Sequence, residues 1–313
     1  MTDLPRLTED FLSQGALSQD TLSESSPNDH PSSGPAPVEQ GTGDNGRGEL
    51  RVHELGRADG PTLVLLHGLS DSGLCWPDAV RRWCHDYRVV APDARGHGQS
   101  PRFDVATSGS NRFDDMVADA VCLLEALADE GHEAPVLVGH SMGAGVAGTV
   151  VATRPDLVRA AVLEDPPWVS GVRSDAPDTI QEWARGFRDN CDAAAAAGKI
   201  EHPLWPESEL VPWAVSKAQL DPSLTDRKQI ARARPWIEVA AAITRPTLVV
   251  TGGREEAVLV TALSRERLAG LGNREIEVGV VPGAGHTVRR DNAEAYHQMV
   301  DPWIRKQFAT AVS

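Results

Sequence analysis

One serine of the sequence stands in a pattern that could make it a nucleophile. Ser141 is the central residue of the pentapeptide GHSMG at 139–143. A short apolar run at 134–138 precedes it, and a run of small residues suited to a packed helix follows at 144–151. A Gly-Ser-Gly turn alone is common, but a strand, a sharp turn and a helix together are typical of a nucleophile elbow. The sequence therefore predicts that Ser141 lies on a strained turn, with its hydroxyl placed to attack a carbonyl group.

A serine hydroxyl needs a neighbouring general base, and one histidine lies where such a base is expected. His286 is on a glycine-rich loop directly after the last predicted strand, and loops at strand carboxyl ends build the sites of open α/β sheets. A carboxylate on another strand end should orient the imidazole, and two candidates compete for this role. Asp165 follows the strand after the elbow helix, and Glu255 follows the next strand of the sheet. The pattern alone does not exclude their neighbours Glu164 and Glu256.

Two backbone N–H groups should stabilise the oxyanion of a tetrahedral intermediate. Met142 directly follows the nucleophile, so we expect it to supply one N–H from the helix N-terminus. Leu69 is expected to supply the other, because it lies on a loop after an apolar strand where Gly68 permits a close approach. His67 ends that strand, so we expect it to brace the loop through hydrogen bonds and not to act as the base.

The segments around these residues alternate between strands and helices. Alternating polar and apolar residues predict an outer antiparallel strand at 50–55. Further strands are predicted at 62–67, 87–92, 134–138, 160–163, 247–250 and 276–281. Helices are predicted at 78–85, 112–129 and 292–308. The predicted fold class is therefore α/β, with a doubly wound, mainly parallel sheet.

One stretch interrupts this alternation. Between 167 and 240 no buried strand is predicted, and the helical segments are broken by several prolines. We expect a small helical cap here, inserted after the strand that ends at Asp165, with the core of the fold at 47–166 and 241–313. Four tryptophans of the cap are predicted to line a pocket for an apolar substrate: Trp168, Trp183, Trp205 and Trp213. The alternative is that the tryptophans only anchor a small domain.

Composition limits the other classes of function. Residues 1–46 are rich in Ser, Pro, Gly, Asp and Glu, so they are predicted to form a disordered tail. The formal net charge is −15 and no run of Lys or Arg occurs, so neither nucleic acid nor a membrane is an expected partner. No signal-peptide pattern and no membrane-spanning apolar stretch is found. The four cysteines lack metal-ligand spacing and are typical of a reducing compartment, so we expect a cytoplasmic protein.

Four motifs in this order resemble those of α/β-hydrolase-fold enzymes, over about residues 48–313. They are His67-Gly68-Leu69, the segment DARGHGQS at 93–100, the elbow pentapeptide, and PGAGH at 282–286. The resemblance implies that the segment 93–100 is a structural turn, so Arg95 and His97 are left out of the catalytic set. It also implies a triad in which the acid takes one of two positions.

Many members of this fold family carry the acid as Gly-x-x-Asp after the penultimate strand, and this chain has Glu255 at that offset. Haloalkane dehalogenases and zearalenone-type lactonases instead place the acid after the strand next to the elbow helix. Asp165 matches that second position, and the resemblance therefore favours Asp165 over Glu255. Dehalogenases and related epoxide hydrolases use an aspartate nucleophile, so Ser141 disfavours their chemistry and favours acyl transfer.

The expected activity is hydrolysis of a carboxylic ester or lactone with an apolar substrate, which could contain a ring, through an acyl-enzyme on Ser141. No metal or organic cofactor is needed for this reaction, and the expected partner is the small apolar substrate itself. Three alternatives stay open: a carbon–carbon bond hydrolase, a cofactor-free perhydrolase with the same triad, and a non-catalytic ligand-binding protein of the same fold. The sequence also leaves open whether the protein forms a homo-oligomer.

Overall fold

The described part of the chain forms a seven-stranded sheet. The computed structural model describes residues 48–103, 111–169, 180–224, 227–230 and 234–309, so the predicted tail at 1–46 lies outside the described residues. The strands are β1 Val52–Gly56, β2 Thr62–Leu66, β3 Arg88–Pro92, β4 Val136–His140, β5 Ala160–Glu164, β6 Thr247–Gly252 and β7 Ile276–Val281. Their order in the sheet is β1-β3-β2-β4-β5-β6-β7. Among these strands β1 alone runs antiparallel to its neighbour, which confirms the predicted mainly parallel sheet.

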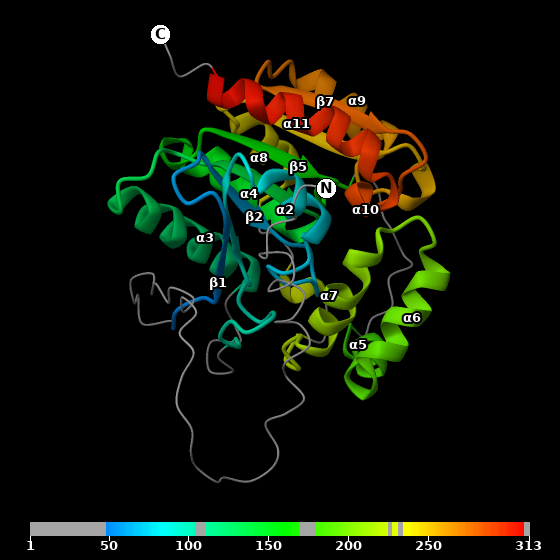
Figure 1. Ribbon diagram of the computed structural model, residues 1–313. Helices are drawn as coiled ribbons and strands as arrows, with labels where there is room; N and C mark the ends of the chain where they lie inside the picture. Colours follow the sequence, from blue (N-terminus) through cyan, green and yellow to red (C-terminus); the bar gives the residue numbers. More distant parts are fainter. Residues whose placement is uncertain (1–47, 104–110, 170–179, 225–226, 231–233, 310–313) are drawn as a thin grey trace, which may run out of the picture.

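Helices cover both faces of the sheet (Figure 1). One face carries α3 Arg112–Asp129, α4 Met142–Thr153, α8 Trp236–Ala242 and α9 Ala262–Leu271. The other face carries α2 Pro77–Trp83, α10 Val288–Asp291 and α11 Ala293–Ala309. Because side chains alternate along a strand, Leu137 of β4 joins the first core whereas Val136 and Val138 join the second. This double burial explains the continuous apolar runs of the inner strands.

None of the helices in the described part of the chain combines the length and the apolar character needed to cross a membrane.

The insertion between β5 and β6 is helical, as predicted. It contains α5 Ile180–Asp189, α6 Cys191–Glu201, α7 Glu207–Ala218, the short 3-10 helix η4 Arg227–Ile230, and α8. The helices α5, α6 and α7 pack on one another and stand beside the sheet as a group (Figure 1). The helix α8 instead packs against α4 and α9, so the expected cap boundary at 240 falls inside a helix of the main body. Residues 170–179, which the predicted cap includes, lie outside the described residues.

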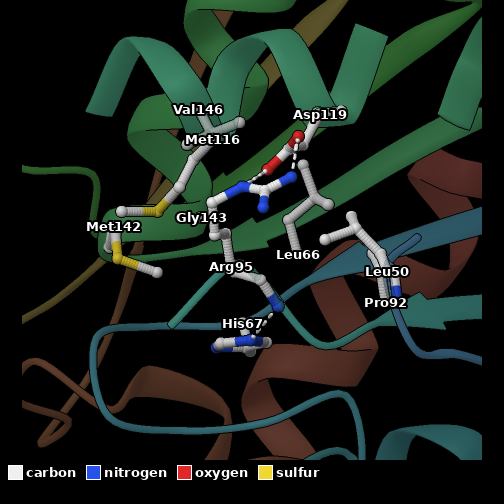
Figure 2. Close-up of a pocket in the computed structure, with 12 residues that line it drawn as sticks. Leu50, Leu66, His67, Pro92, Arg95, Met116, Asp119, Met142, Gly143 and Val146 are labelled. Carbon is white, nitrogen blue, oxygen red and sulfur yellow. Dashed lines mark hydrogen bonds and ion pairs between the residues drawn. The ribbon is translucent and has the colours of Figure 1, made fainter. Parts of the chain in front are cut away.

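A buried ion pair packs the turn at 93–100 against α3. The guanidinium of Arg95 lies 2.8 Å from each carboxylate oxygen of Asp119, and both side chains are buried. Figure 2 shows this pair on the wall of a small cavity of about 30 Å³, which is also lined by Met116 and Met142. Arg95 thus holds the turn in place beside the start of α4, in agreement with its exclusion from the catalytic set.

Three buried histidines lie near the carboxyl ends of the central strands: His67, His97 and His140. His67 Nε2 accepts a hydrogen bond from Ala94 N–H at 2.9 Å, so its Nδ1–H donates to Gly68 O at 2.8 Å. His67 therefore braces its loop, as expected from the sequence. Burial lowers the pKa of His67, lowers the pKa of His97 to about 3, and lowers the pKa of His140 well below its ordinary value.

The ion pair gives a test of stability. Asp119→Ala should lower the free energy of unfolding by about 3–5 kcal/mol, because it leaves the buried guanidinium of Arg95 without this carboxylate. Asp129→Ala is the matched control, since Asp129 is exposed at the end of the same helix and should change the free energy by less than about 0.5 kcal/mol. Urea unfolding measures both values, and equal losses in the two variants would contradict the role given to Asp119.

The histidines give a test of pH dependence. The free energy of unfolding should fall as the pH drops below about 6.5, because unfolded histidines then bind protons whereas His67, His97 and His140 stay neutral in the folded state. Each ring subtracts up to about 1.4 kcal/mol per pH unit until its folded-state pKa is reached. Urea unfolding over this pH range measures the slope. His97→Asn should make the slope shallower, with replacement of the exposed His85 as control, and an unchanged slope in His97→Asn would refute this account.

Candidate active site

Ser141 occupies the turn between β4 and α4. Its φ of 51° and ψ of −113° form a conformation that residues with a side chain rarely adopt. Two glycines make the turn possible. A Cβ on Gly143 would lie 2.0 Å from Leu66 O, and a Cβ on Gly139 would lie 2.5 Å from Gly143 O. The close packing of β2, β4 and α4 therefore requires glycine at both positions, which is the physical basis of the pattern in the sequence.

His286 reaches Ser141 from the loop between β7 and α10. Its Nε2 lies 2.9 Å from Ser141 Oγ, and its Nδ1 lies 2.6 Å from Asp165 Oδ2. Because the carboxylate accepts the Nδ1–H, the lone pair of Nε2 faces the serine hydroxyl. The side chain of His286 is 35% exposed, whereas that of Asp165 is fully buried. This arrangement can take a proton from the hydroxyl and stabilise the resulting imidazolium ion.

The carboxylate of Asp165 is fixed by three further donors. Its Oδ1 accepts hydrogen bonds from Thr251 Oγ1 at 2.8 Å and from Val260 N–H at 3.0 Å. Its Oδ2 accepts from Leu259 N–H at 2.9 Å, in addition to the imidazole of His286. Charge-assisted hydrogen bonds of this kind hold a carboxylate in one orientation. Thr251 was not expected from the sequence, although it lies near the end of β6, the strand that pairs with β5, and strand order therefore places it near Asp165.

The alternative acid, Glu255, lies on the surface in the 3-10 helix η5 Glu255–Ala257. It forms an ion pair with Arg265, which lowers its pKa, and it accepts a hydrogen bond from Ala262 N–H at 2.8 Å. Its described contacts do not include His286. Its neighbour Glu256 is exposed as well. Asp165 therefore contacts His286, whereas the described contacts of the two glutamates after β6 do not include this histidine.

Glu164, the neighbour of Asp165, points elsewhere. Its carboxylate is fully buried and accepts two hydrogen bonds from Arg289. The backbone N–H donates one of 2.8 Å, and Nη1 donates one of 3.0 Å. Burial raises the pKa of Glu164 in spite of this partner. The pair ties the end of β5 to the helix that follows His286. Among the described residues, no group of three or more His, Cys, Asp or Glu side chains is arranged to hold a metal ion.

The two expected oxyanion donors belong to adjoining stretches of backbone. Met142 is the first residue of α4, so its N–H has no acceptor within the helix. The loop with Gly68 and Leu69 passes beside the serine, since a Cβ on Gly68 would lie 3.4 Å from Ser141 Cβ. Within the described residues, no backbone hydrogen bond uses the N–H of Leu69 or of Met142. Neither N–H is therefore taken up by a described backbone acceptor, as an oxyanion donor requires.

Asp291 braces the loop that carries His286. Its Oδ2 accepts from Gly285 N–H at 2.7 Å, and its Oδ1 accepts from Thr287 Oγ1 at 2.9 Å. The same Oδ1 accepts from Trp205 Nε1 of the cap at 2.8 Å. One carboxylate therefore fixes the residues on both sides of His286 and attaches them to the cap. Asp291 was not expected from the sequence, because nothing in the local pattern shows that the chain turns back on itself there.

The tryptophans predicted to line a pocket pack into protein cores. Trp205 and Trp213 are 4% and 8% exposed and meet edge to face within the core of the cap, with ring centres 5.7 Å apart. Trp168 is 1% exposed and stacks on Trp236 at 5.8 Å. The side chain of Trp183 on α5 lies outside the described residues. These contacts favour the alternative that the tryptophans anchor the cap, and they give no support to a pocket wall.

Comparison with known proteins agrees with this architecture. The model of the Alpha/beta hydrolase family matches residues 63–299. A Mesorhizobium japonicum protein named 2-(acetamidomethylene)succinate hydrolase is 29% identical over 267 residues, which cover 80% of this chain and 90% of the relative. The crystal structure of E-2-(acetamidomethylene)succinate hydrolase matches with a TM-score of 0.62 at 25% identity, covering 83% of this chain and 96% of the other. An enol-lactonase from Burkholderia xenovorans matches with a TM-score of 0.59 at 20% identity, covering 83% and 98%. The chain belongs to the alpha/beta hydrolase family.

Proposed function

We propose that this hydrolase cleaves a carboxylic ester or lactone through an acyl-enzyme on Ser141. The hydrogen-bonded chain from Ser141 Oγ through His286 to Asp165 is the observation that carries the proposal. A hydroxyl, an imidazole and a buried carboxylate in this order are the parts that nucleophilic acyl transfer requires. The same chain argues against a non-catalytic binding protein, because such a protein has no need of a strained serine within reach of a base.

Each step has a group in place. Ser141 Oγ attacks the carbonyl carbon while His286 Nε2 takes its proton, and Asp165 stabilises the imidazolium that forms. The N–H groups of Leu69 and Met142 hold the oxyanion of the tetrahedral intermediate. His286 then gives the proton to the leaving alkoxide, which departs as an alcohol. In the second half, His286 takes a proton from water while the water oxygen attacks the acyl-enzyme, and His286 then returns that proton to Ser141 Oγ as the acid is released.

The buried cations near the site support a substrate that is neutral at its reacting end. Three cations described on the neighbouring elements, Lys217, Arg289 and Arg290, are each paired with a buried carboxylate. None of the three is therefore left to pair with a carboxylate of a substrate. This observation supports the apolar ester or lactone that the sequence analysis favours as the small-molecule partner.

A second candidate is hydrolysis of an N-acyl bond. The relative from Mesorhizobium japonicum, which matches over most of both chains, is named for a substrate that contains an acetamide group. The same triad serves this reaction, because His286 could protonate a leaving nitrogen as readily as a leaving oxygen. A carbon–carbon bond hydrolase and a perhydrolase would also use these residues, and product analysis separates them from both candidates.

The catalytic assignments are tested by substitution. Wild type should be labelled by a fluorophosphonate probe and Ser141→Ala should not. Asp165→Asn should lower kcat by about 10⁴-fold, because the imidazole loses the carboxylate that fixes its tautomer. Glu255→Gln is the matched control and should keep the wild-type kcat. An unlabelled wild type would refute the proposed chemistry, and a loss of activity in Glu255→Gln instead of Asp165→Asn would refute the assigned acid.

The bond cleaved is tested by a substrate panel. Lactones, linear esters of equal size, and N-acetyl enamines with and without carboxylates are compared by kcat/KM, with product identification for each. We expect the neutral esters or lactones to be turned over and the carboxylate-bearing substrates to be poor, because the buried cations Lys217, Arg289 and Arg290 are already paired. Preferred turnover of an N-acetyl dicarboxylate would instead establish the second candidate. Lactonase specificity is contradicted if rings and equally large linear esters are turned over alike.

A further inference from the structure

A cluster of buried charges lies between the cap and the two loops that carry the candidate catalytic groups. Its members are all 3% exposed or less: Asp71, Glu164, Glu209, Lys217, Arg289 and Arg290. The three carboxylates balance the three cations. The cap helix α7 contributes Glu209 and Lys217, and α7 also packs against α2 of the main body. The other four members come from the main body.

Lys217 binds the turn that follows Leu69. Its Nζ donates to the carboxylate of Asp71 and to Ser70 O at 3.2 Å. Asp71 N–H donates back to Gly68 O at 3.0 Å, which closes a tight turn around Leu69. The cation of the cap therefore contacts both residues directly after the expected oxyanion donor.

This turn is strained at Ser70. The φ of Ser70 is 68°, a value that costs free energy for a residue with a side chain and persists where neighbouring contacts enforce it. Ser70 Oγ donates to Leu69 O at 2.5 Å, so it also constrains the peptide group that follows Leu69. From the cap, Lys217 contacts both the carbonyl oxygen of Ser70 and Oδ1 of Asp71, whose Oδ2 is paired with Arg290.

Asp71 and Arg290 hold one another in their ionised forms, whereas burial lowers the pKa of Lys217 and raises the pKa of Glu164. Burial would raise the pKa of Asp71, but Arg290 and Lys217 hold it well below its usual range. Arg290 lies 3.1 Å from Asp71 Oδ2 and 2.8 Å from Glu209 Oε2. A buried ion pair gains little stability over apolar packing, so its use is better sought in the geometry that it fixes. Here the fixed geometry is that of the loop with Leu69.

We propose that Lys217 is a positioning residue that aims Leu69 N–H at the oxyanion by holding Ser70 and Asp71. The inference rests on the proposed function and deepens it, because it makes oxyanion stabilisation depend on the docking of a cap helix. A cap that moved away would withdraw Lys217 and relax the turn. The enzyme would then be competent in acyl transfer only with α7 seated on the main body.

The test compares two substitutions on the same helix. Lys217→Met removes the contact with Ser70, while Asp71 keeps Arg290 as its partner. Glu209→Gln removes a charge from the same cluster without touching the turn, because Glu209 contacts Arg290 and Asp78 N–H. Both variants should lower the melting temperature, so stability alone does not separate them. The assay ester is p-nitrophenyl butyrate, and a trifluoromethyl ketone serves as a mimic of the tetrahedral oxyanion.

Lys217→Met should lower kcat by about 10- to 100-fold, which is less than the loss expected when a whole oxyanion donor is removed. KM should change little, and the inhibition constant of the trifluoromethyl ketone should rise by the same factor as kcat/KM falls. Glu209→Gln should keep both constants within about threefold of wild type. Lys217→Arg, which keeps the cation, should show a smaller loss of kcat/KM with a matching rise in the inhibition constant. This variant replaces Lys217→Met in the test if Lys217→Met does not fold.

Two outcomes would overturn the inference: unchanged kcat in the Lys217 variants, or equal losses in Glu209→Gln, which would make the cluster merely structural. Neither outcome bears on the proposed function, which fails separately if wild type neither reacts with the fluorophosphonate nor turns over any ester.

Discussion

The hydrogen bond between His286 and Asp165 joins groups that are 121 residues apart in the chain, and the candidate site depends on it. The carboxylate is buried and already accepts three other hydrogen bonds, so it offers the imidazole a single position. That position places Nε2 against the serine hydroxyl. A weaker or more mobile acid would leave the imidazole free to rotate, and the strained turn at Ser141 would then present a hydroxyl without a base.

The rest of the molecule supports this contact from two sides. On the imidazole side, Asp291 fixes the residues next to His286, and the pair of Glu164 and Arg289 ties α10 to β5. On the side of the expected oxyanion donors, His67 binds Gly68 at the start of the loop with Leu69. Lys217 of α7 binds Ser70 at the end of the same loop. The cap is connected to both loops, since Trp205 reaches the loop of His286 through Asp291 and Lys217 contacts the loop of Leu69 at Ser70.

The sheet and the turn at Ser141 could be predicted from the sequence, because their requirements appear as local or periodic patterns of residues. The double burial of inner strands leaves continuous apolar runs, and the close approach of β2, β4 and α4 requires glycine at 139 and 143. The surroundings of the tryptophans, in contrast, could not be predicted from the sequence. An indole suits a pocket wall and a small core equally well, so composition favoured neither, and the packing of Trp205 on Trp213 shows that both belong to the core of the cap.

The sequence by itself determined the sheet, the elbow and the pairing of a serine with a histidine on a late loop, because strand periodicity and the steric needs of a turn are written in neighbouring residues. Only the tertiary structure shows that Asp165, and not Glu255, contacts His286, because both residues follow strands of the same sheet and the sequence does not give the direction of the chain after each strand. It also decided the partners of Asp291 and Lys217, because a buried charge is satisfied by whatever the fold brings near it, and distance along the chain does not limit that choice.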